Sequence, residues 1–191
     1  MKKASRMPWP ILVGLLLCPA AAFAQTPLSH RDQSFLRGYF DHQGVAIGYD
    51  RLALKKASKD AVRRFAQAEL DMYRSLGTRM QALDRKAGLA AAGMLDAPAG
   101  GGDSGPYAVV NDTAWLRTLS GDRFDQEFLL RVILMHQRMI RHSLREMAAP
   151  GANPEVVAYA RTALALLNEQ TEAAGNLYNG LVFPPGPPPS P

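Results

Sequence analysis

The second half of this chain repeats its first half at a constant, gap-free offset of 94 residues. Leu36-Arg37 recurs as Leu130-Arg131, His42-Gln43 recurs as His136-Gln137, and Leu83 recurs as Leu177. A repeat of this length predicts two copies of one helical hairpin that together close a single bundle. The offset also places one histidine, His42 or His136, at the matching position of each half.

Four long segments carry the helical period of apolar side chains, at about residues 32–57, 59–86, 122–149 and 154–181. Ser29 with Asp32 has the spacing of a capping box, and Asn153 before Pro154 is a strong start signal. The glycine-rich residues 87–106 are expected to form a crossover loop, followed by a short helix with Trp115 docked on the bundle. No segment alternates with period two. The sequence therefore predicts an all-α, ferritin-like four-helix bundle made of two repeated hairpins with a long crossover.

The first 24 residues have the three parts of a secretory signal peptide. Lys2, Lys3 and Arg6 form a basic start, and Ile11–Leu17 is an apolar run. Ala22-Phe23-Ala24 is a small-x-small cleavage site. We therefore expect a signal peptide at 1–24, a bundle at 25–181 and a proline-rich tail at 182–191. The expected location is the periplasm, with no transmembrane segment in the mature chain.

Composition narrows the range of functions. Removing the three basic residues of the signal from the 22 in the chain leaves 19 against 17 acidic residues, so the net charge falls from +5 to +2 and gives no argument for nucleic acid. Cys18, the only cysteine, lies inside the signal, so thiolate chemistry is not expected. The sequence has no nucleophile-elbow, phosphate-loop or His-Glu-x-x-His motif, and we expect a protein that is not an enzyme.

His42 and His136 each lie in the middle of an apolar stripe, so both rings should point inward. Under one interpretation they are core histidines that hydrogen-bond to Tyr73, Gln43 or Gln137. Under the other they are metal ligands. Bundle iron chemistry is not indicated, because the chain has no Glu-x-x-His sequence.

A second group of candidate metal ligands is Met135, Met139 and His142, which share one face of a helix. Thioether and imidazole groups suit Cu(I), although methionines at this spacing also serve as core filler. Glu69 lies on a core stripe, where we expect a boundary salt bridge to Arg37 or Arg131.

Two stretches resemble a known family: LALKKASKDAVRRFAQAELD at Leu52–Asp71 and LRTLSGDRFDQEFLLRVILMHQ at Leu116–Gln137. They are similar to a bacterial exported ferritin-like family of unknown function, often labelled putative outer membrane protein. The second stretch is also similar to a Met- and His-rich periplasmic sister family, some of whose members are associated with copper. The resemblance implies a periplasmic four-helix bundle. The chain departs from these families at two places. Met72-Tyr73 stands where the first family usually has an Asp-His pair, and Met135-His136 stands where the sister family has a His-His pair.

Two functions stay open at this point. The first is a non-enzymatic periplasmic bundle with a binding or envelope-stress role, whose partner is a second copy or another envelope protein. The second is a periplasmic protein that binds copper or another transition metal through the core histidines and methionines. Each departure removes one potential imidazole ligand, which favours the first function, with no cofactor.

Overall fold

The computed structural model describes residues 28–87 and 113–183, and every regular element within these ranges is an α-helix. The helices are α1 (His30–Lys56), α2 (Asp60–Ala87), α3 (Thr113–Thr118), α4 (Gly121–Met147) and α5 (Pro154–Val182). The expected signal peptide, the proline-rich tail from residue 184 onward, and all of the expected crossover loop except Ala87 lie outside the described residues.

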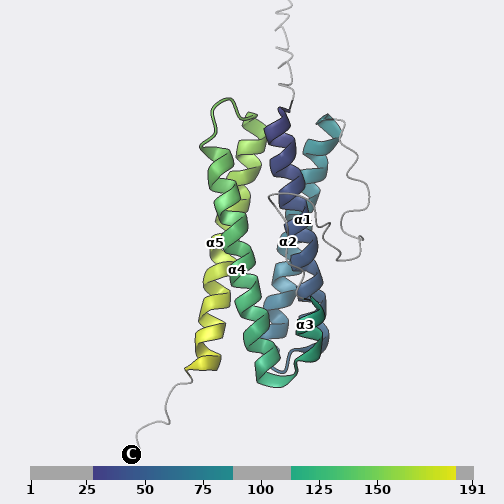
Figure 1. Cartoon of the computed structure of the whole chain (residues 1–191), viewed down its shortest axis with the longest axis vertical. Coiled ribbons are helices and arrows are strands. Elements are labelled where there is room, and N and C mark those ends of the chain that lie inside the picture. The colour runs from purple at the N-terminus through teal and green to yellow at the C-terminus, as the bar shows by residue number, and fades with distance from the viewer. Residues whose placement is uncertain (1–27, 88–112, 184–191) are drawn as a thin grey trace, which may run out of the picture.

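The four long helices form two antiparallel hairpins, α1 with α2 and α4 with α5 (Figure 1). Helix α1 packs on α2 and α4, and α5 packs on α4 and α2, so α2 and α4 lie diagonally across the core. The two diagonal helices run in the same direction (Figure 1). This is the all-α, ferritin-like bundle that the sequence predicts.

The sequence repeat is also a repeat of structure. Shifting the bounds of α2 by 94 residues gives 154–181, and α5 spans Pro154–Val182. The same shift applied to α1 gives 124–150, against Gly121–Met147 for α4. The two hairpins are therefore equivalent elements, and matching positions in them can be compared directly.

The local start signals act as predicted. The Ser29 hydroxyl accepts a hydrogen bond from the Asp32 amide at 3.1 Å, and the Asp32 carboxylate accepts one from the Ser29 amide at 2.8 Å. At α5, the Asn153 side chain accepts a bond from the Glu155 amide at 2.9 Å. Each cap satisfies amide groups that the first helical turn leaves without a partner.

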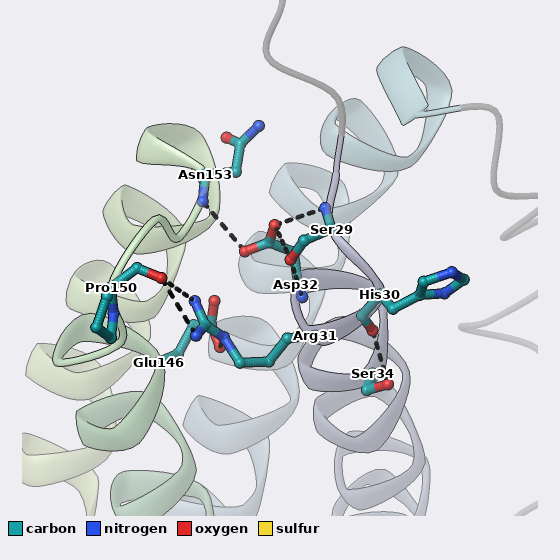
Figure 2. A network of polar contacts seen from close by, with 8 residues as sticks. All are labelled: Ser29, His30, Arg31, Asp32, Ser34, Glu146, Pro150 and Asn153. Atoms are coloured by element: carbon teal, nitrogen blue, oxygen red, sulfur yellow. Dashed lines mark hydrogen bonds and ion pairs between the residues drawn. The ribbon is translucent and has the colours of Figure 1, made fainter.

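A carboxylate of each hairpin accepts hydrogen bonds from backbone amides in the turn of the other hairpin. Asp32 of α1 accepts a hydrogen bond from the Asn153 amide at 3.1 Å, at the start of α5 (Figure 2). Asp125 of α4 accepts bonds from the amides of Ser58 and Lys59, both at 2.9 Å, at the start of α2. Burial alone would raise the pKa of Asp32, but the hydrogen bonds from Ser29 and Asn153 bring it below its usual value. Two carboxylates thus tie the hairpins together, one at each end of the bundle.

The docking of Trp115 was wrongly predicted. Its side chain is 43% exposed, whereas Leu116 is fully buried. Helix α3 has only six residues, and it turns Thr113 and Leu116, three residues apart, toward the bundle. Trp115 consequently faces outward.

Candidate functional site

The structure brings two of the predicted site residues together, His42 of α1 and His142 of α4. Their ring centroids are 5.4 Å apart, with the rings tilted by 55°. His42 is buried, and its Nδ1 lies 2.6 Å from the Gly38 carbonyl oxygen. Because a carbonyl oxygen can only accept, Nδ1 carries the hydrogen, and the lone pair of the neutral ring lies on Nε2. His142 is half-buried.

Both members of this pair are held in the neutral form. Burial lowers the pKa of His42, and the charge of Arg138 adds to the effect. Burial also lowers the pKa of His142 to about 4, with contributions from His42, Arg145 and Arg141. At neutral pH the two imidazoles are therefore unprotonated, as metal-binding or hydrogen-bonding rings must be.

His136 lies elsewhere, in the centre of the core. Its Nε2 is 2.8 Å from a Glu69 carboxylate oxygen and 3.1 Å from the Tyr73 hydroxyl, and its Nδ1 is 3.2 Å from the Thr171 hydroxyl. Both His136 and Glu69 are fully buried. The predicted hydrogen bond between a core histidine and Tyr73 is thus confirmed for His136.

The expected boundary salt bridge of Glu69 was wrong. Arg131 instead contacts Glu127 one turn earlier on α4, at 3.8 Å. The physical reason is the diagonal placement of α2 and α4, which points Glu69 through the core centre at His136. Gln43 was also expected to contact a histidine, but it donates to the Tyr73 backbone carbonyl at 2.6 Å.

Asp50 of α1 is a fully buried carboxyl group that was not among the predicted site residues. Neither of its oxygens has a hydrogen-bond partner among the described residues. Burial raises the pKa of Asp50 well above its usual value, and the nearby charge of Glu69 raises it further. A signal was available, because Asp50 lies four residues after Ala46 and three before Ala53, on the same stripe of α1.

The predicted methionines belong to the core. Met135 and Met139 are buried, and the Met139 sulfur lies 3.9 Å from the Tyr73 hydroxyl. Met139 is three residues from both His136 and His142, so it lies between the central cluster and the histidine pair on α4. Within residues 28–87 and 113–183, no group of three or more His, Cys, Asp or Glu side chains is placed to hold a metal ion.

A separate polar network closes the end of the bundle where α1 begins (Figure 2). The Arg31 Nε lies 3.7 Å from the Glu146 carboxylate. The two terminal nitrogens of Arg31 each lie 3.4 Å from the Pro150 carbonyl oxygen. Burial raises the pKa of Glu146 to about 7, aided by Asp32 and opposed by Arg31. These contacts join α1 to the α4–α5 turn and serve the fold.

Comparisons with known proteins agree with this architecture. The crystal structure of a DUF305 fragment from Deinococcus radiodurans is similar, with a TM-score of 0.67 and 20% sequence identity, over 81% of this chain and 99% of that one. At that identity the likeness concerns the fold alone. No curated protein matches the chain. In the part of the chain that the structure describes, no helix has the length and apolar character needed to cross a membrane. Residues 18–177 match a domain of unknown function (DUF4142), and the chain belongs to that family.

Proposed function

We propose that this protein is an exported, non-enzymatic binding protein of the bacterial envelope, and that it takes a soft transition-metal ion of the Cu(I) type at the His42–His142 pair. The observation that carries the proposal is the approach of two imidazole rings from different helices to a centroid distance of 5.4 Å. Two such rings supply the nitrogen ligands that transition metals most often use in proteins.

The donor atoms at the pair suit a soft ion. The hydrogen bond from His42 Nδ1 to Gly38 fixes the ring and leaves Nε2 as the donor atom. Met139 lies one turn before His142 on α4 and offers a thioether, which favours Cu(I). Arg138, Arg141 and Arg145 act on the two rings with positive charge. That charge repels a divalent cation about twice as strongly as a monovalent one.

A binding role is supported over catalysis by the state of the other imidazole. His136 is fully buried and already bonded to Glu69, Tyr73 and Thr171. An acid–base pair sealed in this way cannot reach a substrate, because a general base must lie within hydrogen-bond distance of the proton that it removes.

Export is supported by the amino-terminal sequence alone: its basic start, its apolar run and the Ala22-Phe23-Ala24 cleavage site. The expected result is an intact mass in periplasmic extract that begins at Gln25. A chain recovered with Met1 in place contradicts the proposed location.

The metal proposal is tested with purified protein titrated anaerobically with Cu(I), and separately with Zn(II). Cu(I) should raise the melting temperature, because an ion that binds only the folded state stabilises it by RT ln(1 + [L]/Kd), about 2.7 kcal/mol at a hundredfold excess over Kd. The variant His42→Gln/His142→Gln should lose this rise. The variant Met139→Leu should still bind Cu(I), but more weakly, and should show a smaller rise in melting temperature.

The matched control is His30→Gln, because His30 is an exposed histidine at the start of α1. This variant should keep the full copper response. The proposal fails if Cu(I) does not change the melting temperature of the unsubstituted protein, or if the double variant responds as that protein does. A stronger response to Zn(II) than to Cu(I) contradicts the selectivity argument.

A further inference from the structure

The outer side of α4 carries arginines and leucines next to the histidine site, and three of these arginines also act on its rings with their charge. Leu134 and Leu144 are 43% and 49% exposed, and three exposed arginines lie on the same side. At 3.6 residues per turn these side chains fall within an arc of about 120°. We call this set the arginine face; it consists of Leu134, Arg138, Arg141, Leu144 and Arg145.

Three arginines that no carboxylate neutralises lie together on this face, whereas two of the arginines of α2 have acidic partners. On α2, Arg63 contacts Asp60 and Arg74 contacts Asp71, each three residues earlier. Arg138, Arg141 and Arg145 form no ion pair or hydrogen bond with any described part of the chain.

Acidic groups are also scarce around the face. Helix α4 has no acidic residue between Glu127 and Glu146. Glu146 itself is buried, at the end of the bundle where α1 begins. Asp41 of the neighbouring helix α1 is exposed and acts on His42, but it makes no ion pair with these arginines. The face therefore presents three uncompensated positive charges.

We propose that the arginine face docks on an anionic lipid membrane surface. A guanidinium group matches the geometry of a phosphate headgroup and binds it with two parallel hydrogen bonds. Each arginine near an anionic surface adds to the attraction, and leucines interleaved with basic residues enter the boundary between headgroups and acyl chains.

Geometry favours a lipid surface over an acidic protein or a nucleic acid. Helix α4 runs along the length of the bundle (Figure 1), and the side chains on its exposed side repeat with the helical period, which suits a flat partner. A purely ionic partner would use the arginines and gain nothing from Leu134 and Leu144. Only a partner with both phosphate groups and an apolar layer uses the whole face.

The test measures partition of the processed protein, beginning at Gln25, onto vesicles of phosphatidylcholine with and without phosphatidylglycerol. Binding should require the anionic lipid. The variant Arg138→Gln/Arg141→Gln/Arg145→Gln should bind about a hundredfold more weakly, given the usual contribution of an arginine at such a surface. Leu134→Ser/Leu144→Ser should also bind more weakly, with its charge unchanged.

The matched control is Arg64→Gln/Arg79→Gln/Arg161→Gln, which removes the same net charge from exposed positions on α2 and α5. It should keep nearly all of the binding. Equal partition of the unsubstituted protein onto neutral and anionic vesicles overturns the proposal, as does an equal loss in the control. If the leucine variant binds as the unsubstituted protein does, the proposed entry of the leucines into the lipid is wrong, and the face binds the anionic surface through charge alone. Unchanged circular dichroism of each variant ensures that the bundle is intact.

Discussion

His42 and His136 occupy matching positions of the two repeats, yet they have opposite surroundings. His136 is bonded to a carboxylate, a phenol and a hydroxyl in the core centre, whereas His42 bonds one backbone carbonyl and faces His142. The cause lies on the helix opposite each ring. Helix α2 supplies Glu69 and Tyr73, and the positions that match these two on α5 are Ala163 and Leu167, both buried and apolar. A repeated residue thus takes its role from the half of the molecule that faces it.

Removing the imidazole tests this contrast most strongly. His136→Leu leaves the buried Glu69 carboxyl group without the ring nitrogen that lies 2.8 Å from it, and an unsatisfied buried polar group costs about 1–3 kcal/mol, more where the group is charged. His42→Leu removes one hydrogen bond to a carbonyl and should cost about 1 kcal/mol. Urea denaturation of both variants measures the difference. Equal losses would show that the carboxylate does not set His136 apart.

Asp50 offers a second way to sharpen the comparison, because its matching residue on α4 is the exposed Leu144. Burial raises the pKa of Asp50 in the folded protein, so its contribution to stability is full below the unfolded pKa near 3.9 and declines as pH rises toward the folded pKa. Asp50→Asn should remove this decline. At pH 8 the variant should exceed the unsubstituted protein by more than about 1 kcal/mol, the equivalent of one pKa unit.

The measurement compares urea midpoints of the two proteins at pH 4.5 and pH 8. Glu169→Gln, which changes an exposed carboxyl group on α5, is the control and should leave the pH dependence unaltered. An Asp50→Asn variant that is equally destabilised at both pH values would mean that the carboxyl group is ionised in the folded state.

The smallest expected effect is the change in stability that accompanies the titration of His142, in the His42–His142 pair. The pKa of His142 is lowered to about 4, so its contribution to stability is full above the unfolded pKa near 6.5 and is lost as pH falls from there toward 4. Because His142 is only half-buried, solvent screening should keep this loss below about 1 kcal/mol. Proton NMR of the metal-free protein reports the titration directly. A His142 resonance that titrates near pH 6.5 would remove the distinction between this ring and a surface histidine.

Most of the fold follows from local signals and the repeat. The capping box at Ser29 and the start at Asn153-Pro154 fix two helix ends, and the offset relates the remaining elements. The inward direction of His42 and His136 also follows from periodicity. Their partners do not, because periodicity along one helix cannot tell which helix lies diagonally opposite. Glu69 was misplaced for that reason. Trp115 was misplaced because hydrophobicity alone does not determine which side of a six-residue helix faces the core.

The carboxylates of Asp32 and Asp125 have a consequence for how the molecule comes apart. Each one caps the turn of the opposite hairpin, so a hairpin that separates leaves bare amide groups at the start of its second helix. We therefore expect the whole bundle to unfold as one cooperative unit. At the offset of 94 residues Asp32 matches Gln126 and Asp125 matches Arg31, so the two contacts are not copies of each other, and each hairpin holds its partner through a residue that the repeat does not share.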